Sequence, residues 1–288
     1  MTDKKWTIGE ILTWTKQYFG EKGVDNPRLD AEVLLSHVLG RDRLYLYVNF
    51  DQPLEANELG AFRELVKRRA LRMPVAYLLG WKEFMGLRFV VGPAVLIPRP
   101  DTEILVEYAL NRLKASPSPV VLDVGTGSGA IAVSLLSRMT EAQGMAVDIS
   151  VEALKVAEKN AADHGVAERL ELKPGDLFVP AQGRKFDAVL SNPPYITTSD
   201  MAELAPELGY EPKGALIAGV DGLDFYRRIV AEGAIYIKED GFMVLEVGAG
   251  QAAEVCALAD GASGLIAVEV VKDYAGIDRV VVLERRLL

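Results

Sequence analysis

An asparagine, two prolines and a tyrosine stand together at Asn192-Pro193-Pro194-Tyr195, directly after an apolar run over residues 186–191 that predicts a buried strand. We therefore expect them at the carboxyl end of a strand, where open α/β sheets bind their ligands. Consecutive prolines fix φ and remove two N–H donors, so the Asn192 side chain and the Pro193 carbonyl present acceptors in one geometry. Two acceptors beside the flat Tyr195 ring could hold the N–H bonds of an amide or amino group whose nitrogen is to be alkylated.

A glycine-rich turn upstream is the second feature that could do chemistry. The β-branched run 120–124 leads into residues 125–129 (Gly-Thr-Gly-Ser-Gly), and an amphipathic helical pattern follows. Glycines let the backbone approach a ligand closely, and a helix N-terminus offers unpaired N–H groups. Asp148 ends the next predicted strand, nineteen residues after Gly129, at a distance where an acid commonly binds ribose hydroxyls. The pattern predicts a nucleotide site of the strand–loop–helix type.

The glycine turn is compatible with two different ligands. Gly125, Gly127 and Ala130 also satisfy the relaxed dinucleotide fingerprint. Asp123 separates the two interpretations, because its carboxylate would repel a pyrophosphate but suits the cationic methionine part of S-adenosylmethionine, directly or through hydrogen bonds. Together with the acceptors at Asn192, it favours a methyl donor over a nicotinamide. A turn that only tightens strand–helix packing is a third interpretation, which the other polar residues make weaker.

Composition limits the remaining possibilities. The chain has 288 residues, of which half are hydrophobic and a quarter charged, an ordinary globular composition with enough length for two domains. One cysteine, Cys256, excludes an internal disulfide and a multi-cysteine metal site, and we expect no bound metal. Apolar stretches are strand- or helix-length, and the N-terminus lacks the apolar core of a signal peptide. We therefore expect a cytoplasmic protein that does not bind a membrane.

Charge is distributed unevenly along the chain. Of the formal net charge of −9, residues 1–85 contribute +1, so the remaining residues carry −10. A catalytic domain this acidic would be repelled by a phosphate backbone, which argues against duplex DNA or bare RNA as the main substrate. We expect a protein partner and no direct contact with nucleic acid.

Residues 1–73 predict a small helical domain. Three helical patterns occur, introduced by a capping box at residues 7–10, by an Asn-Pro pair at residues 26–27, and near residue 59. From Pro74 to Pro98 the pattern changes to short extended runs, which predict a hairpin linker between two domains.

Residues 99–288 predict an α/β domain. Asp101 is placed to cap its first helix. We expect strands near residues 119–124, 143–148, 169–173, 186–191, 241–247, 265–271 and 279–285, and helices near 129–139, 151–164, 223–237 and 250–259. Such alternation predicts a doubly wound, mostly parallel sheet. Residues 272–278 are too few for a crossover helix, so the last two strands should be antiparallel neighbours.

With these motifs in view, the sequence resembles the HemK-type protein-glutamine methyltransferases, which modify peptide chain release factors. The resemblance runs almost end to end and is carried by residues 74–80 (Pro-Val-Ala-Tyr-Leu-Leu-Gly), 83–87 (Glu-Phe-Met-Gly-Leu), 97–103 (Ile-Pro-Arg-Pro-Asp-Thr-Glu), 123–129 and 192–195. The Asn-Pro-Pro-Tyr tetrapeptide is shared with adenine-specific DNA methyltransferases, whereas the run over 97–103 is more particular to this family. The chain departs from the family at Arg72 and Met73, where a Gly-Glu pair is expected.

This resemblance implies a seven-stranded, Rossmann-like methyltransferase domain, preceded by a small all-α domain and a β-hairpin linker, with S-adenosylmethionine as cofactor. The cofactor-binding residues that we predict are Asp123, Gly125, Thr126, Gly127, Ser128, Gly129, Asp148, Asp176, Leu177 and Asn192. The predicted substrate-binding residues are Asn192, Pro193, Pro194, Tyr195 and Arg99, of which Asn192, Pro193 and Tyr195 orient the reacting nitrogen. Many members of the family carry a larger aromatic residue at the position of Leu177, which would stack on the adenine.

We predict that the chain methylates the glutamine side chain in the Gly-Gly-Gln motif of class I release factors. A paralogous branch methylates a glutamine of a large-subunit ribosomal protein and has the same core motifs, but the linker and N-terminal pattern favour the release factor. A nucleic-acid amino-methyltransferase fits the tetrapeptide, yet the acidic domain has no obvious target-reading insertion. A non-catalytic binding protein would not need donor-loop glycines and substrate acceptors together.

Overall fold

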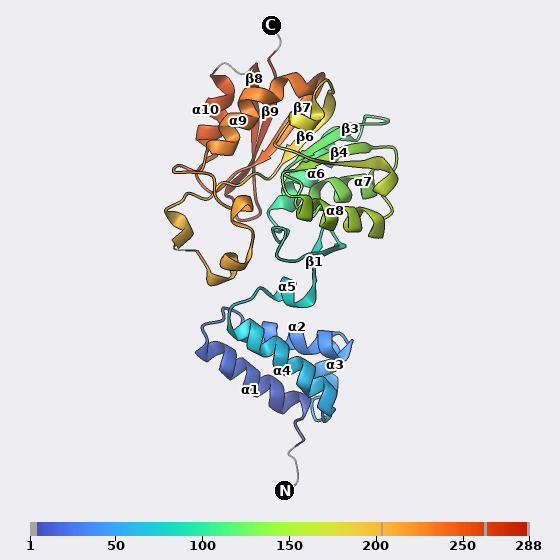
Figure 1. Cartoon of the computed structure of the whole chain (residues 1–288), viewed down its shortest axis with the longest axis vertical. Coiled ribbons are helices and arrows are strands. Elements are labelled where there is room, and N and C mark those ends of the chain that lie inside the picture. The colour runs from blue at the N-terminus through green and yellow to red at the C-terminus, as the bar shows by residue number, and fades with distance from the viewer. Residues whose placement is uncertain (1–4, 203, 262–263, 287–288) are drawn as a thin grey trace. The chain divides into compact units, whose positions relative to one another are not determined.

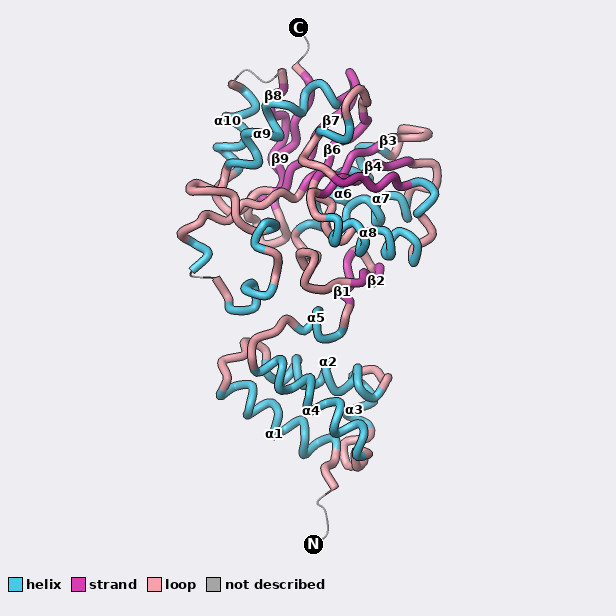
Figure 2. The backbone as a smooth tube through the Cα atoms, viewed as in Figure 1, coloured by secondary structure: helices cyan, strands magenta, loops and turns pink. Residues whose placement is uncertain are grey.

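The computed structural model describes residues 5–202, 204–261 and 264–286, and the chain divides into two compact units (Figure 1). One unit contains Met1–Gly80 together with Ala205–Tyr210, and the other contains Trp81–Leu204 and Glu211–Leu288. The described strands all belong to the second unit, as the colouring by secondary structure in Figure 2 shows. The chain therefore leaves the second unit after Leu204 and returns to it at Glu211.

The first unit is helical. Its elements are α1 (Ile8–Glu21), α2 (Pro27–Leu39), α3 (Arg43–Val48), α4 (Ala56–Ala70), α5 (Val75–Leu79) and a short 3-10 helix, η4 (Pro206–Tyr210). The predicted helix starts are confirmed, because Thr7 and Glu10 form a capping box and Pro27 occupies the first turn of α2. Their apolar faces share one core that includes the fully buried rings of Phe19 and Phe62.

Two short helices of this unit differ from the sequence-based expectation. Extended structure was predicted from Pro74 onward, but Val75–Leu79 form α5, in which Pro74 is the N-cap and Gly80 ends the helix in the left-handed conformation. The helix α3 was also missed. Short apolar runs do not distinguish a helix from a strand by periodicity. In the structure, Tyr77 and Leu78 of this run are buried within a helix.

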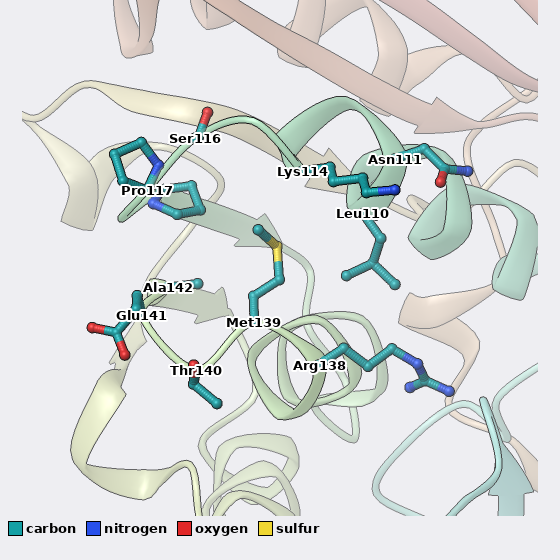
Figure 3. A pocket seen from close by; sticks show the side chains of 11 residues that line it. Leu110, Asn111, Lys114, Ser116, Pro117, Arg138, Met139, Thr140, Glu141 and Ala142 are labelled. Carbon is teal, nitrogen blue, oxygen red and sulfur yellow. The ribbon is translucent and has the colours of Figure 1, made fainter.

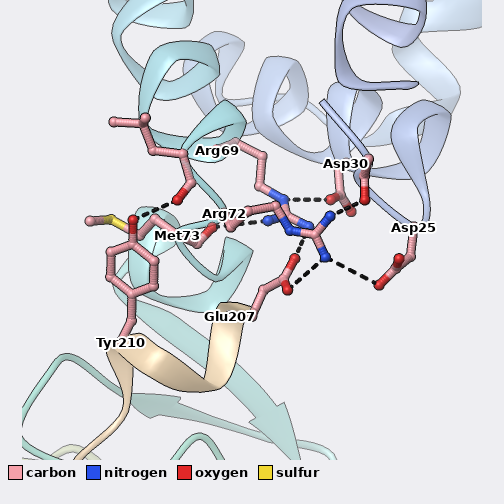
Figure 4. Close-up of polar contacts among 9 residues, drawn as sticks. Asp25, Asp30, Arg69, Arg72, Met73, Glu207 and Tyr210 are labelled. Atoms are coloured by element: carbon pink, nitrogen blue, oxygen red, sulfur yellow. Dashed lines mark hydrogen bonds and ion pairs between the residues drawn. The ribbon is translucent and has the colours of Figure 1, made fainter. Parts of the chain in front are cut away.

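Ion pairs attach residues 205–210 to the helical unit (Figure 4). The Arg69 side chain is 6 % exposed and places Nε 2.7 Å from Asp30 Oδ2 and Nη2 2.9 Å from Glu207 Oε1. Arg72 Nη2 lies 2.8 Å from the other carboxylate oxygen, Glu207 Oε2. Glu207 is thus held by two cations from the end of α4 and the turn that follows it.

Arg72 stands where the family resemblance implies a glycine. Its backbone conformation explains why this position favours glycine. Its φ of 71° lies in the left-handed region, where a side chain costs about 1 kcal/mol relative to glycine. The guanidinium offsets this cost by pairing with Glu207 and donating a hydrogen bond to the Gly23 carbonyl. Next to it, the Tyr210 hydroxyl donates to the Leu71 carbonyl at 2.6 Å.

We expect Arg69→Met to destabilise the protein by about 3 kcal/mol, because Asp30 would remain as a buried carboxylate without its partner. Burial already raises the pKa of Asp30, and Arg69 opposes that rise. Without Arg69 the pKa rises further, so the loss of stability should be larger at about pH 8 than at about pH 5. Urea unfolding followed by circular dichroism measures the change.

Lys67→Met is the matched control for this prediction. Lys67 lies on the same helix, pairs with Glu64 and has a side chain that is 67 % exposed, so its replacement should change stability by less than about 0.5 kcal/mol. Equal effects of the two substitutions would show that the buried ion pair contributes nothing specific.

The second unit is an α/β domain preceded by a hairpin. Its strands are β1 (Trp81–Phe84), β2 (Leu87–Val90), β3 (Val120–Val124), β4 (Gln143–Asp148), β5 (Leu170–Pro174), β6 (Phe186–Ser191), β7 (Ile237–Glu246), β8 (Leu265–Lys272) and β9 (Asp278–Arg285). Its α-helices are α6 (Thr102–Leu113), α7 (Ala130–Arg138), α8 (Val151–Asp163), α9 (Asp224–Gly233) and α10 (Ala252–Asp260). Short 3-10 helices occur at η1 (Ala167–Arg169), η2 (Val179–Ala181), η3 (Asp200–Ala202), η5 (Lys213–Ala215) and η6 (Ala234–Tyr236).

The sheet of this unit has seven strands in the order β5-β4-β3-β6-β7-β9-β8. Only β9 runs against its neighbours, pairing antiparallel with β7 and with β8, so the predicted mostly parallel sheet and its final antiparallel pair are confirmed. Alternate residues of each strand face opposite cores. Val121 packs with residues of α6, α7 and α8, whereas Leu122 packs with residues of α9 and α10.

The start of β7 differs from the prediction. A helix was expected to reach residue 237, but α9 ends at Gly233 and β7 begins at Ile237. The charged residues 238–240 interrupt the apolar pattern, so the sequence does not indicate this first part of the strand. The pairing of β6 with β7 shifts register after Phe186, and β7 continues beyond the shift. Near the shift, a Cβ at Gly241 would lie 2.9 Å from the Phe186 carbonyl oxygen.

Candidate active site

Most of the polar residues predicted from the sequence lie at the carboxyl ends of neighbouring strands. The glycine turn follows β3, Asp148 ends β4, and Asn192 follows β6. Because β3 pairs in parallel with both β4 and β6, these ends meet at the point where doubly wound sheets bind ligands.

A cavity of about 510 Å³ lies at a different place (Figure 3). It is lined by Ser116 and Pro117, which precede β3, and by Thr140, Glu141 and Ala142, which precede β4. These residues belong to the amino ends of the strands, where none of the predicted site residues lies. We therefore place the candidate site at the carboxyl ends.

The three glycines of the turn have two different tasks. Gly125, Gly127 and Gly129 all have positive φ values, of 74°, 55° and 80°. At Gly129 a Cβ would lie 3.2 Å from Ala157 Cβ, so this glycine lets α7 approach α8. At Gly125 and Gly127 a Cβ would meet no atom within 4 Å. These two glycines therefore keep the space beside the turn open.

Four of the five backbone N–H groups of residues 125–129 donate to other groups of the protein. Gly125 N and Thr126 N donate to the Val147 carbonyl at 2.8 and 3.0 Å, and Gly129 N donates to the Thr126 carbonyl at 2.9 Å. Gly127 N donates to a carboxylate oxygen of Asp148 at 2.8 Å. A pyrophosphate needs such N–H groups for itself. Their occupation argues against the dinucleotide interpretation.

Asp123 lies beneath the turn and is 0 % exposed. Its Oδ2 accepts hydrogen bonds from Thr126 Oγ1 at 2.6 Å and from Ala132 N at 3.2 Å. Burial raises the pKa of Asp123 to about 7, although those two hydrogen bonds oppose the rise. Its Oδ1 is buried and has no hydrogen-bond partner among the described residues. The site therefore retains an unused acceptor below the glycines.

Asp148 supports the turn from the neighbouring strand. Besides the bond from Gly127 N, it accepts one from Ser150 N at 2.8 Å through Oδ1. The carboxylate is half-buried, and each oxygen has a second lone pair for a ligand. Asp148 is thus fixed in orientation before any ligand arrives.

Asp176 and Leu177 follow β5. The Asp176 carboxylate is 47 % exposed and pairs with Arg228 at 2.6 Å. Leu177 is 9 % exposed and has a φ of 47°, an uncommon conformation for a residue other than glycine. Backbone strain of this kind clusters at ligand sites. The Leu177 side chain packs into the core formed with α9 and α10.

The Asn192 loop is held in one conformation by residues from other elements. Asn192 Nδ2 donates to Thr102 Oγ1, at the start of α6, at 3.0 Å. Gln251 Nε2 donates to the Tyr195 carbonyl at 3.1 Å. Pro193 is buried, whereas Pro194 and Tyr195 are half-buried. The orientation of the Asn192 amide is therefore defined by Thr102.

Thr102 and Glu246 lie at the candidate site and were not among the site residues predicted from the sequence. Glu246 ends β7 and is 1 % exposed, and Thr102 is 4 % exposed. Burial raises the pKa of Glu246 to about 7, while a hydrogen bond from the Thr102 side chain and the charge of Arg279 oppose the rise. An acid that ends a long apolar run was visible in the sequence. Its position beside β6 was not, because that depends on strand order.

The proline-rich segment before α6 contributes two ion pairs. Arg99 Nη2 lies 2.5 Å from Glu211 Oε1, and Glu211 also accepts a bond from Ile97 N at 3.0 Å. Asp101 occupies the predicted N-cap position of α6, but its side chain forms no capping hydrogen bond. It lies 3.3 Å from Arg279 Nη2 instead. This buried cation attracts the carboxylate away from the helix end.

Metal-binding clusters and membrane-spanning helices do not occur within residues 5–202, 204–261 and 264–286. No group of three or more His, Cys, Asp or Glu side chains there could hold a metal ion. No helix there is long and apolar enough to cross a membrane.

Comparison with known proteins agrees with this geometry. The family models of the PrmC N-terminal domain and of the methyltransferase small domain match residues 10–80 and 101–210. The fold is similar to that of the hMettl16 catalytic domain, solved in complex with MAT2A 3′UTR hairpin 6, with a TM-score of 0.56, 14 % identity and coverage of 75 % of this chain and 81 % of that one. A methyltransferase from Pyrococcus furiosus gives a TM-score of 0.52, 16 % identity and coverage of 75 % and 97 %.

Fold and site together define an S-adenosylmethionine-dependent methyltransferase. Two relatives identify its family. The release factor glutamine methyltransferase of Geobacter sulfurreducens is 49 % identical over 284 residues, which cover 98 % of each chain. That of Chlorobaculum tepidum is 42 % identical over 287 residues and covers 96 % of this chain and 97 % of its own. The chain belongs to the release factor glutamine methyltransferase family, and the predicted resemblance is confirmed.

The open space at Gly127 generates a testable prediction. Gly127→Ala should lower the affinity for S-adenosylmethionine by about tenfold or more, a loss of at least about 1.4 kcal/mol, because a methyl group would enter the space that the donor needs. Gly165→Ala is the matched control, since Gly165 has a φ of 69° and equally open surroundings. It carries the same backbone cost away from the turn and should bind the donor normally. Isothermal calorimetry measures both; equal losses would attribute the effect to backbone strain.

A second prediction concerns Asp148. Asp148→Ala should weaken donor binding by about 10- to 100-fold, because a charge-assisted hydrogen bond to ribose contributes about 1.5–3 kcal/mol. The variant also loses the bond to Gly127 N, so its melting temperature should be measured beside the affinity. Asp163→Ala, an exposed acid on α8 that pairs with Lys159, serves as the control. Unchanged donor affinity in Asp148→Ala would place the ribose elsewhere.

Proposed function

We propose that this enzyme transfers a methyl group from S-adenosylmethionine to the side-chain nitrogen of the glutamine in the Gly-Gly-Gln motif of class I release factors. The observation that carries the proposal is the orientation of the Asn192 carboxamide. Because Nδ2 is bonded to Thr102, Oδ1 is the atom left for a substrate. The names of the full-length relatives support the same substrate.

Asn192 and Pro193 supply the two acceptors that a primary amide requires. None of the described residues donates a hydrogen bond to Asn192 Oδ1 or to the Pro193 carbonyl. The nitrogen of an amide is a poor nucleophile, because its lone pair is delocalised into the carbonyl group. Fixing both N–H bonds orients that nitrogen, and the acceptors ease the positive charge that develops on it. Tyr195 packs beside the amide, and no histidine or cysteine base is needed.

The residues of the glycine turn fit the cofactor. S-adenosylmethionine supplies an electrophilic methyl group on a cationic sulfur. The unused Asp123 Oδ1 and the acidity of the site suit its positive charge, and Gly125 and Gly127 leave room for it. We assign Thr126, Ser128 and Gly129 to the same cofactor-binding turn. We assign Asp148 to the ribose hydroxyls, and Asp176 with Leu177 to the adenine edge.

We assign the substrate side of the site to Pro194, Tyr195 and Arg99. The two prolines make a rigid slot, and glycines before the substrate glutamine would let a loop enter it without side-chain clashes. The acidity of residues 86–288 favours a protein over a nucleic acid as the substrate. We propose that residues 1–73 recognise the rest of the release factor, that residues 74–98 link them to the methyltransferase domain over residues 99–288, and that the enzyme acts in the cytoplasm.

Mass spectrometry after incubation with S-adenosylmethionine and purified release factor tests the proposal. One methyl group should appear on the glutamine of the Gly-Gly-Gln motif. Asn192→Ala should reduce this transfer by about 1000-fold or more, as expected for a lost transition-state contact, while calorimetry shows nearly unchanged donor binding. Methylation of a ribosomal protein or of DNA, with the release factor unmodified, would overturn the assignment of the substrate.

A further inference from the structure

We infer that Glu246 is a positioning residue, which acts through Thr102 to set the direction in which the Asn192 carboxamide faces. The inference rests on the proposed function, because it concerns the residue that we assign to the substrate amide. Neither Glu246 nor Thr102 is proposed to touch the reacting atoms.

The three side chains come from three elements that meet at one sheet edge. In the parallel pairing of β6 with β7, Ser191 lies opposite Leu245. The next residues, Asn192 and Glu246, therefore leave adjacent strand ends together. Thr102 reaches them from the first turn of α6.

The hydrogen bonds that connect these side chains run in one direction, from Asn192 through Thr102 to Glu246. Asn192 Nδ2 donates to Thr102 Oγ1 at 3.0 Å. The Thr102 side chain is also a hydrogen-bond partner of the Glu246 carboxylate, and because a hydroxyl has a single proton and an ionised carboxylate has none, Thr102 is the donor while Glu246 is ionised. Thr102 and Glu246 are 4 % and 1 % exposed, so solvent does not offer easy substitutes for these partners.

An ionised carboxylate can only accept hydrogen bonds. While Glu246 is ionised, Thr102 must donate to it, and the Thr102 oxygen must then accept from Asn192. This order leaves Asn192 Oδ1 for the substrate. A neutral Glu246 can instead donate to Thr102, which permits Thr102 to donate to Asn192 Oδ1. The flipped amide would present donors to the substrate amide, and productive binding would be lost.

The charges around Glu246 place its titration near neutrality. Burial raises the pKa of Glu246 to about 7, and Asp101 adds to the rise, whereas Arg279 and Arg99 oppose it together with the bond from Thr102. Burial and the charge of Glu246 also raise the pKa of the Tyr195 and Tyr226 hydroxyl groups. Since the ionised form is the productive one, activity should be present above about pH 7 and fall as the pH decreases through that value.

Asp123 is a second buried acid whose pKa is raised to about 7, so the experiment must separate the two. Asp123 lies under the donor turn, and its titration should change donor affinity. Glu246 should change turnover when the donor is saturating. The measured quantity is therefore kcat/KM for release factor as a function of pH, at saturating S-adenosylmethionine.

The unmodified enzyme should lose about tenfold in kcat/KM between about pH 8 and about pH 6, the equivalent of one hydrogen bond to the substrate amide. Glu246→Gln, which like neutral Glu246 can both donate and accept, should remain near the low-pH value of the unmodified enzyme throughout this range. Thr102→Val should also be slow and independent of pH, whereas Thr102→Ser should retain the normal profile. Glu254→Gln, an exposed acid on α10, is the control.

Donor affinity by calorimetry and melting temperature should be nearly unchanged in Glu246→Gln and in Thr102→Ser. A pH dependence that persists in Glu246→Gln would overturn the inference, as would full activity in Thr102→Val or a defect confined to donor binding. Absence of any methylation of release factor by the unmodified enzyme would instead contradict the proposed function.

Discussion

The parallel pairing of β3 with β4 on one side and β6 on the other is the constraint on which the active site depends. It brings the ends of strands that are far apart in the sequence to one edge of the sheet. The glycine turn after β3, which we assign to the donor, is supported there by Asp148 from β4, and the Asn192 loop after β6, which we assign to the substrate, begins at the same level. The groups that we assign to donor and substrate are thereby adjacent without any long loop having to fold back over the sheet. The same order places β7, and with it Glu246, on the far side of the substrate loop.

Two buried carboxylates, Asp123 and Glu246, underlie the groups that we assign to the ligands. Burying an ionisable group is costly unless hydrogen bonds or charges compensate, and each of these acids keeps one oxygen without a partner among the described residues. Asp123 accepts hydrogen bonds from Thr126 and from the start of α7, and we infer that Glu246 acts through Thr102 on Asn192. Burial of these two acids therefore lowers stability, and their hydrogen bonds fix the directions of the polar groups above them.

The segment that follows the substrate loop divides its contacts between the two compact units. Residues 205–210 belong to the helical unit and are held by Arg69 and Arg72, whereas Glu211, the next residue, binds Arg99 and the Ile97 backbone in the methyltransferase unit. Arg72 adopts a backbone conformation that favours glycine, and its ion pair with Glu207 accounts for an arginine at this position. The departure of this chain from the family pattern therefore has a local physical reason.

The sequence by itself determined the class of fold and the family, and it predicted the residues that we assign to both ligand loops. Strand and helix patterns, the glycine turn and the Asn-Pro-Pro-Tyr tetrapeptide are local features, since backbone conformation and side-chain periodicity depend on neighbours in the chain. The tertiary structure decided which distant groups meet. It placed Glu246 beside Asn192, moved the Asp101 carboxylate from its helix end to Arg279, and turned residues 75–79 into a helix. These outcomes depend on strand order, burial and charges from remote elements, which local patterns do not contain.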